Sequence, residues 1–323
     1  MSDPILKVQN LHTVFRTSGG VVQAVRGVSF EVGMGETLGI VGESGSGKSV
    51  TALSLMRLVP SPPGKITSGS VEIYGRDLLR VPMRDMREVR GGMISMIFQD
   101  PFSSLNPTMT LGAQVAEAIR AHTKITKKEA WNRTLELFKA VRIPSPEIRL
   151  KQYPHQISGG QRQRVMIALA FSTSPKLLIA DEPTTALDVT VQAQIMSLMD
   201  DFQKRTDAAI LLITHDLGIV AEMCDRVLVM YAGRIVEKGT VEQIFRSPRH
   251  PYTVGLLESL PQLNADARQR LKSIPGQPPN LAQLPAGCPF ADRCPKVMQI
   301  CRTIDPEVSI LEGGQRTRCH LYT

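Results

Sequence analysis

Apolar and polar positions follow two different periods along the chain. Near the start, alternation of apolar and polar residues predicts strands over 5–9 and 21–32. Short apolar runs typical of buried strands follow at 37–41, 92–98, 176–180, 209–213 and 226–230. Apolar residues spaced by three and four predict helices over about 107–173, and another helix at 190–204. Alternating strands and helices indicate an α/β fold, with a mostly parallel sheet and a helical insertion in its middle.

The pattern changes after about residue 247. Between residues 275 and 295 there are six prolines, at 275, 278, 279, 285, 289 and 295. Proline at that density prevents regular helix or strand, so this part is predicted to be a small loop-rich appendage with little core. We therefore expect one domain over 1–248, with a helical subdomain at about 100–173, and a C-terminal extension over 249–323.

Composition and charge exclude some classes of protein. Hydrophobic residues make up 42% and charged residues 21%, which is ordinary for a globular protein and excludes intrinsic disorder. The net charge of +8 favours binding to an anionic partner: nucleic acid, an anionic membrane surface or phosphorylated ligands. The charge alone does not distinguish these three. Aromatic residues are only 5%, which disfavours a stacking platform for single strands. No apolar run approaches the roughly 18 residues of a membrane helix, and no export signal is visible, so we expect a cytosolic protein.

A glycine-rich loop between a predicted strand and a helix-like segment over 48–58 matches the phosphate-binding pattern G-x-x-x-x-G-K-[ST] in full. Its residues are Gly42, Glu43, Ser44, Gly45, Ser46, Gly47, Lys48 and Ser49. The glycines let backbone N–H groups face phosphates, and the helix N-terminus adds positive potential. We expect Lys48 to reach the β- and γ-phosphates and Ser49 to bind Mg²⁺.

Phosphoryl transfer also needs an acidic partner for the metal at the end of another apolar strand. The run at 177–180 ends in Asp181 and Glu182. Asp181 is predicted to hold Mg²⁺ through water. Glu182, one residue further, is predicted to polarise the attacking water.

The cysteines are unevenly placed. Four of the five, Cys288, Cys294, Cys301 and Cys319, lie in the last 36 residues. In a chain without a visible export signal, such clustering indicates metal binding before disulfides. A loop-rich appendage also needs a staple, which these thiols are placed to supply. Cys224 is expected to be a buried thiol.

Directly before a helical stretch stand Ile157, Ser158, Gly159, Gly160 and Gln161. With this signature segment, the chain resembles the ATP-binding-cassette ATPases over about residues 4–248. The resemblance implies a P-loop core with a mostly parallel sheet, an antiparallel β subdomain and a helical subdomain. Ile157 replaces the usual leucine. Thr185, Ala186, Leu187 and Asp188 match the family's D-loop, with threonine where serine is common.

The resemblance assigns further roles. Gln99 would bind Mg²⁺, and His215 would contact the γ-phosphate. The Ser158–Gln161 segment stands about 110 residues from the phosphate loop, and in this family such a segment completes the nucleotide site of a second, similar ATPase subunit. Phe15 is the nearest candidate for the aromatic side chain that stacks on adenine, and an ordinary core position is the alternative.

Features of the extension and of the segment around Gln99 narrow the resemblance to one branch of the family. The chain is similar there to the ATPase subunits of dipeptide and oligopeptide importers. The similar parts are residues 249–253 (RHPYT), Gln99-Asp100-Pro101, Ser104-Leu105-Asn106-Pro107 and the cysteine spacing C-x5-C-x6-C-x17-C. In that branch the cysteines resemble ligands of a [4Fe–4S] cluster. A zinc site, disulfides or free thiols are the alternatives. The absence of C-x2-C pairs, which are typical of zinc sites, makes zinc less expected.

The resulting prediction is an ATPase, with ATP, Mg²⁺ and the cluster as cofactors, that drives import of short peptides. It would lie at the cytoplasmic face of the inner membrane as a peripheral subunit, under two membrane-spanning permease subunits. An extracytoplasmic solute-binding protein would act with it indirectly, and no nucleic acid is expected. Importers of nickel or another small solute are the alternative. A soluble cassette ATPase and a metal-binding regulator with an inert cassette are the other hypotheses.

Overall fold

The computed structural model describes residues 3–100, 104–185, 187–259 and 273–323. The chain forms two compact units. The first unit comprises Met1–Ile5, Val32–Glu36 and Arg80–Ile213; the second comprises Leu6–Glu31, Thr37–Leu79 and Thr214–Thr323. The boundary expected at residue 248 lies within the second unit and stays a prediction.

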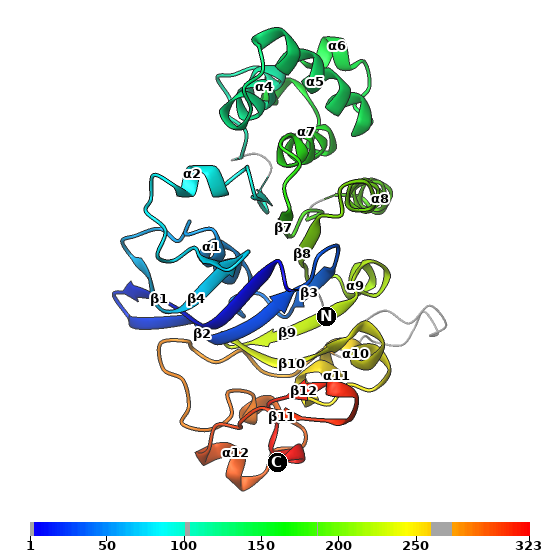
Figure 1. Cartoon of the computed structure of the whole chain (residues 1–323). Helices are drawn as coiled ribbons and strands as arrows, with labels where there is room; N and C mark the ends of the chain where they lie inside the picture. Colours follow the sequence, from blue (N-terminus) through cyan, green and yellow to red (C-terminus); the bar gives the residue numbers. More distant parts are fainter. Residues whose placement is uncertain (1–2, 101–103, 186, 260–272) are drawn as a thin grey trace. The chain divides into compact units, whose positions relative to one another are not determined.

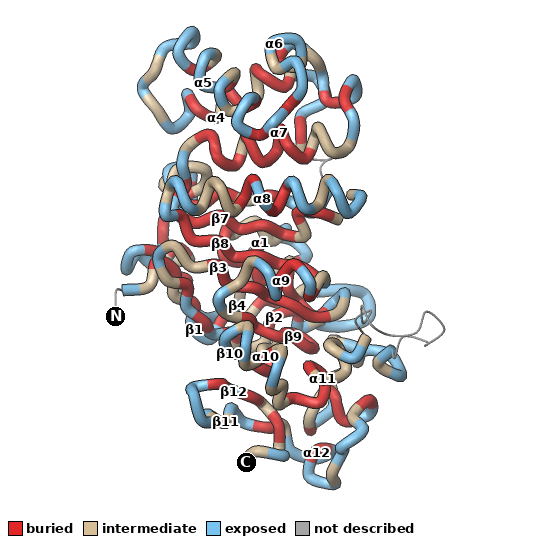
Figure 2. The backbone as a smooth tube through the Cα atoms, turned by 90° about the vertical axis from the view of Figure 1, so that its right-hand side faces the viewer, coloured by how far each residue is buried: buried red, intermediate tan, exposed pale blue. Residues whose placement is uncertain are grey.

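A parallel sheet forms the centre of the first unit. It contains β6 (Ile94–Ile97), β7 (Leu177–Asp181) and β8 (Ala209–Ile213), with β7 paired in parallel to both neighbours. All residues of β7 and β8 are buried, as the red tube of these strands in Figure 2 shows. Burial on both faces explains why these strands are continuous apolar runs rather than alternating ones.

Helices make up most of the rest of the first unit. They are α2 (Met86–Val89), α4 (Leu111–His122), α5 (Lys127–Ala140), α6 (Pro146–Arg149), α7 (Gly159–Phe171) and α8 (Val189–Thr206), with a 3₁₀ turn at Pro154–Gln156. Helices α4, α5 and α7 pack together (Figure 1), and Ile119 and Phe138 are fully buried. Thr126 and Glu129 cap α5 reciprocally, which fixes where this helix begins. The helical region expected over about 107–173 thus contains α4 to α7.

The second unit contains an antiparallel sheet in the order β2-β1-β4-β5. Its strands are β1 (Leu6–Thr17), β2 (Gly20–Val32), β4 (Gly64–Ile73) and β5 (Arg76–Asp77). In register, Leu6 faces Ile73 and Val8 faces Val71, and all four side chains are buried. The β1 strand is longer than the predicted 5–9, because pairing with β4 continues to Phe15.

A mixed sheet forms the other part of the second unit. Strand β3 (Thr37–Val41) runs parallel to β9 (Arg226–Tyr231), and β10 (Arg234–Thr240) returns antiparallel to β9. The C-terminal extension adds β12 (Arg316–Thr317) to β10, followed by β11 (Ser309–Ile310). The extension is therefore joined to the sheet by backbone pairing.

The helices of the second unit are short. They are α1 (Lys48–Leu55), α9 (Leu217–Met223), α10 (Val241–Arg246), α11 (Pro251–Glu258) and α12 (Gln299–Thr303), with 3₁₀ turns at Ala291–Arg293, Glu312–Gly314 and His320–Tyr322. Helix α1 ends before the predicted residue 58, since Arg57 has a φ of 51° that a right-handed helix excludes. Between 275 and 295 the only regular structure is the first of these turns, as the prolines predicted.

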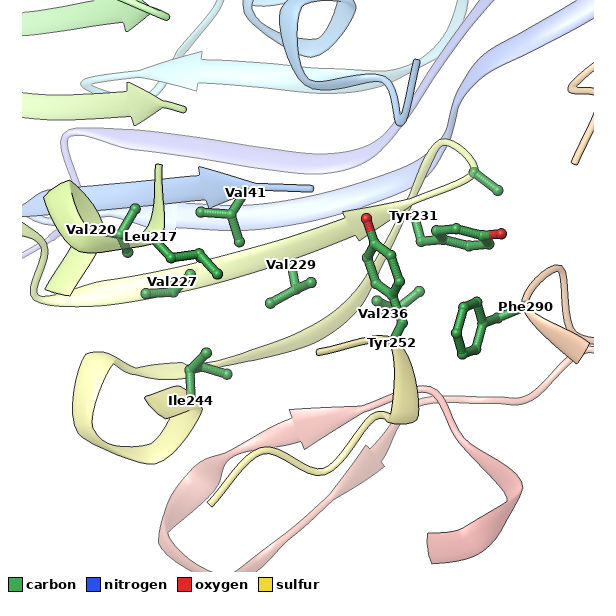
Figure 3. Packing of buried hydrophobic residues seen from close by; sticks show 11 residues of the cluster. Val41, Leu217, Val220, Val227, Val229, Tyr231, Val236, Ile244, Tyr252 and Phe290 are labelled. Carbon is green, nitrogen blue, oxygen red and sulfur yellow. The ribbon is translucent and has the colours of Figure 1, made fainter. Parts of the chain in front are cut away.

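Aromatic rings of the extension are part of the hydrophobic core of the second unit. Figure 3 shows Tyr231, Tyr252 and Phe290 beside one another, next to valines of β3, β9 and β10. The ring centroid of Tyr231 lies 4.6 Å from that of Tyr252 and 5.3 Å from that of Phe290. Tyr252 is 0% exposed and Phe290 is 2% exposed. The extension thus shares a core with the sheet, whereas its composition predicted little core.

Candidate functional site

The phosphate loop connects β3 to α1, and its shape depends on glycine. Gly42 and Gly47 have φ angles of 150° and 103°, which favour glycine strongly. A Cβ atom at Gly42 would collide with the carbonyl oxygen of Met230, and one at Gly47 with that of Ala24. The loop is therefore packed tightly on the strands that carry it, with its backbone fixed before any ligand binds.

The side chain of Lys48 is folded back on this loop. Its Nζ donates hydrogen bonds to the carbonyl oxygens of Gly42, at 2.7 Å, and Glu43, at 2.9 Å, and Lys48 is only 5% exposed. The backbone N–H of Ser46 also donates to the Glu43 carbonyl. Ser46 Oγ is buried and has no hydrogen-bond partner among the described residues. This arrangement holds a cation and a spare hydroxyl at the point where phosphate oxygens are expected.

Two residues of the C-terminal extension hold Glu43 of the loop. The backbone N–H of Glu43 donates to the hydroxyl of Tyr252 at 2.8 Å. The guanidinium of Arg293 donates to both carboxylate oxygens of Glu43, at 2.6 and 2.8 Å. Hydrogen bonds to Glu43 raise the pKa of Arg293 above its usual value. Sequence reasoning missed these contacts, because Arg293 lies 250 positions from Glu43 and no motif links them.

In the first unit, the structure brings Gln99 and Glu182 together at the end of the parallel sheet. Gln99 Nε2 donates to Glu182 Oε2 at 3.0 Å, and Thr185 Oγ1 donates to the same oxygen at 2.8 Å. Glu182 has a φ of 46°, an unusual value that often marks functional positions. Its backbone N–H donates to the Ile213 carbonyl, which holds this conformation. Asp181, the last residue of β7, is 4% exposed.

The signature segment forms the start of α7. Ser158 is the N-cap: its hydroxyl accepts a hydrogen bond from the Gln161 N–H, and the Gln161 side chain accepts one from the Ser158 N–H. Ser158 is exposed, and nothing lies within 4 Å of the place where a Cβ at Gly159 would stand. This helix N-terminus is therefore open enough to receive an anion from outside the unit.

His215 and Phe15 belong to the second unit. His215 is exposed and stands between the end of β8 and α9, whose N-cap is Asp216. Phe15 is half-buried in β1, and its ring lies close to Gly64 of β4. Pro101 and Ala186, which contributed to the sequence motifs, lie outside the described residues.

The four clustered cysteines all lie in the second unit. The backbone N–H of Cys288 donates to the Cys301 carbonyl at 2.8 Å. The pKa of the Cys288 thiol is raised to about 12, mainly by burial and in smaller part by the thiols of Cys301, Cys319 and Cys294. Among the described residues, however, no group of three or more His, Cys, Asp or Glu side chains is placed to hold a metal ion. The metal or cluster site predicted from these cysteines is therefore not confirmed.

Cys224 is separate from this group. It directly follows α9, and its sulfur lies close to Gly39 of β3. Burial raises the pKa of its thiol to about 12. Cys224 packs against the hydrophobic core of the second unit but is only partly buried, so the prediction of a buried thiol is met in part.

Comparisons with known proteins agree with this geometry. A family model described as "ABC transporter" matches residues 25–185, and one described as "Oligopeptide/dipeptide transporter, C-terminal region" matches residues 236–301. The dipeptide transport ATP-binding protein DppD of Bacillus subtilis (strain 168) is 52% identical over 319 residues, which are 99% of this chain and 95% of that protein. The chain belongs to the ATP-binding proteins of the ABC transporter family.

Other relatives extend the comparison. The oligopeptide transport ATP-binding protein OppD of Bacillus subtilis (strain 168) is 55% identical over 296 residues, covering 92% of this chain and 83% of that protein. Among solved structures, a dimeric ATP-binding cassette bound to ADP and Pi in a post-hydrolysis state superposes with a TM-score of 0.67 at 26% identity. That match covers 73% of this chain and 98% of the cassette. The α/β prediction of the ABC type is confirmed.

Family membership also confirms the predicted activity, since ABC cassettes hydrolyse ATP. The first family model spans the phosphate loop, Gln99, the signature segment and Glu182. The second spans Tyr252 and Arg293, which hold Glu43, together with three of the four clustered cysteines. In the described part of the chain, no helix is both long and apolar enough to cross a membrane.

Proposed function

We propose that this chain is the ATP-hydrolysing subunit of an importer of dipeptides and oligopeptides. The observation that carries the proposal is the pair of family models. The nucleotide-binding part matches the model of ABC transporters, and the extension matches the model of the C-terminal region of oligopeptide and dipeptide transporters. Relatives named for dipeptide and oligopeptide transport cover nearly the whole chain at about half identity. Nickel or another small solute is the alternative cargo.

The roles proposed for the site residues come from the sequence motifs and from membership of the family. Lys48 exchanges the carbonyls of Gly42 and Glu43 for the β- and γ-phosphates of ATP, and His215 contacts the γ-phosphate. Ser49, Gln99 and Asp181 would hold Mg²⁺, and the ion would supply positive charge that offsets the charge of the phosphates. Glu182 orients and polarises the attacking water. The hydrogen bonds from Gln99 and Thr185 support this role, because they fix the carboxylate at the strand end.

The site is completed by a second, similar ATPase subunit. The open N-terminus of α7, with Ser158, Gly159, Gly160 and Gln161, supplies N–H groups to the γ-phosphate bound by that partner. The dimeric state of the similar cassette bound to ADP and Pi supports this arrangement. Two permease subunits in the membrane bind the ATPase pair, which acts as a peripheral protein at the cytoplasmic face. The solute-binding protein acts through these permease subunits.

Phe15 is proposed to stack on the adenine ring. Its half-buried side chain belongs to the same unit as the phosphate loop. Replacing Phe15 with alanine should weaken ATP more than inorganic triphosphate, because only ATP carries the base. Equal weakening of both ligands would assign Phe15 to the core instead.

The four clustered cysteines are proposed to hold one [4Fe–4S] cluster with a structural role. The donor set fits, because four thiols of one short segment are the usual ligands of such a cluster. Their mutual effect on the Cys288 pKa indicates that they share a neighbourhood. Among the described residues no group of three or more His, Cys, Asp or Glu side chains is placed to hold a metal ion, so the proposal rests on the donor set and on the resemblance.

The test of the main proposal is reconstitution with the neighbouring permease and ATPase subunits in lipid vesicles. ATP hydrolysis should rise when the solute-binding protein is loaded with a short peptide. If nickel stimulates ATP hydrolysis and peptides do not, the transported solute is nickel, and the ATPase role still holds. ATP hydrolysis that ignores the membrane subunits altogether would contradict a transport function.

A further inference from the structure

Two residues of the C-terminal extension, Tyr252 and Arg293, form hydrogen bonds with Glu43 of the phosphate loop. We propose that Arg293 is a positioning residue for ATP binding: it neutralises the Glu43 carboxylate and holds the loop in its binding conformation. This inference rests on the proposed nucleotide site. It assigns to the extension a role in nucleotide affinity, in addition to any role in transport.

Glu43 is held from three sides. Its N–H donates to Tyr252 Oη, its carbonyl accepts from Lys48 Nζ, and its carboxylate accepts two hydrogen bonds from Arg293. This carbonyl is one of the two that accept hydrogen bonds from the Lys48 ammonium, the other being that of Gly42, so a displacement of Glu43 shifts the phosphate-binding cation. The extension therefore acts on Lys48 through a single intervening residue.

Arg293 is itself fixed by the extension and the sheet. Its side chain is 5% exposed, its Nε donates to the Pro275 carbonyl at 3.0 Å, and its Nη1 donates to Tyr231 Oη at 3.3 Å. The guanidinium carbon lies 5.8 Å from the centre of the Tyr231 ring and 5.9 Å from that of Phe290. These rings belong to the core shown in Figure 3. An arginine anchored in this way transmits any shift of the extension, because it has little freedom to readjust.

The pairing has an electrostatic consequence. Glu43 puts a negative charge in the loop that wraps the negatively charged phosphates of ATP. With Arg293 paired to it, that charge is compensated within the protein. Without Arg293, a partly buried carboxylate would be left uncompensated and would oppose phosphate binding. Arg293 should therefore matter more than Glu43, and neutralising Glu43 should repair the loss of Arg293.

This order of effects separates a positioning role from general stabilisation. If the contact only held the extension in place, removing both partners would be at least as harmful as removing one. If Arg293 acts by compensating Glu43, the double variant Glu43→Gln with Arg293→Met should bind ATP better than Arg293→Met alone. Arg293→Lys keeps the positive charge but loses the bidentate hydrogen bonding, so its affinity for ATP should lie between those of wild type and Arg293→Met.

The experiment measures the Kd of a fluorescent ATP analogue for the full chain in equilibrium titrations, with thermal unfolding to check folding. Arg293→Met should weaken binding about tenfold or more, and Glu43→Gln should weaken it less. The double variant should recover most of the loss. The matched control is Asp305→Asn, which breaks the ion pair between Asp305 of the extension and Arg234 of β10 without touching the loop. It should bind as wild type does.

Three results would overturn the inference. These are unchanged binding by Arg293→Met, a double variant as weak as Arg293→Met, or an equal loss in Asp305→Asn. Failure of the proposed function is recognised separately. Wild type that does not bind the analogue, or Lys48→Ala that binds it normally, would overturn the nucleotide site, and the inference with it.

Discussion

The side-chain amide of Gln99 donates a 3.0 Å hydrogen bond to the carboxylate of Glu182, although the two residues are 83 positions apart in the sequence. Gln99 comes shortly after β6, and Glu182 directly follows β7, to which β6 pairs in parallel. Parallel pairing brings the carboxyl ends of both strands to one edge, where polar side chains can meet. The bond links a residue assigned to Mg²⁺ with the residue assigned to the attacking water.

Replacing Glu182 with glutamine should separate ATP binding from hydrolysis. The amide can still accept the hydrogen bond from Thr185, so the strand end should stay folded, but it cannot polarise water. Hydrolysis by the assembled pair should fall on the order of a hundredfold or more, while the Kd for ATP stays near that of wild type. Phosphate release and equilibrium binding measure the two effects.

The control for this prediction is Glu222→Gln, an exposed position in α9. It should hydrolyse ATP as wild type does. Turnover at the wild-type rate in Glu182→Gln would remove Glu182 from the mechanism.

An acidic residue at Gly159 should disable the site of the partner subunit. The structure has room for a side chain there, and a carboxylate suits a helix N-terminus, so Gly159→Asp should fold well. The same carboxylate occupies the place proposed for the γ-phosphate and repels it. ATP binding by the isolated chain should be retained, whereas stimulation by the partner ATPase should fall at least tenfold.

Lys127→Asp is the matched control, because it puts an acid at the first residue of α5 in the same unit. Its stimulation should resemble that of wild type.

A separate check is concentration dependence: the isolated wild-type chain should be a poor ATPase at high dilution. Full activity of a monomer would contradict the shared site.

The sequence predicted those parts of the molecule that local patterns determine. Buried strands β3, β7, β8 and β9 came from apolar runs, and the phosphate loop came from a motif whose glycines have φ angles that require them. Strands β4 and β10 were missed. They carry polar and charged side chains, such as Thr67 and Lys238, on positions that their neighbours leave exposed or half-buried.

The contact between Arg293 and Glu43 could not be predicted for a different reason. It depends on how the extension folds back onto the sheet, and one arginine among many basic residues carries no local signal. The proline pattern predicted loops correctly but not the burial of Phe290, because burial depends on the partner surface offered by Tyr231 and Tyr252.

Acidification should destabilise the second unit through His250. This side chain is 2% exposed, and burial lowers its pKa from 6.5 to about 4. The unfolded chain therefore binds a proton between about pH 6.5 and 4 that the folded chain does not, so stability falls as the pH falls through that window. The loss is at most about 3 kcal/mol. Burial raises the pKa of nearby Glu237, whose carboxylate accepts from the His250 N–H, and this opposes the effect at the acidic end.

Unfolding by denaturant at pH 7 and at pH 5 measures this dependence. In His250→Asn, an amide oxygen can still accept the hydrogen bond that the Tyr252 N–H gives to Nδ1, so helix α11 keeps its cap. The variant should lose less stability than wild type between the two pH values. An equal loss in both proteins would assign the pH dependence to other groups.

The last prediction concerns the four cysteines of the extension. Protein purified without air should contain iron and acid-labile sulfide in equal amounts, because a [4Fe–4S] cluster has one sulfide for each iron. Replacing Cys288, Cys294, Cys301 or Cys319 with serine should remove the colour, whereas Cys224→Ser, next to Gly39 and away from this group, should keep it. Since Arg293 directly precedes Cys294, loss of the cluster should also weaken ATP binding, but less than Arg293→Met does. Stoichiometric zinc without sulfide would replace the cluster by a single ion, and four freely reactive thiols in the native protein would exclude both.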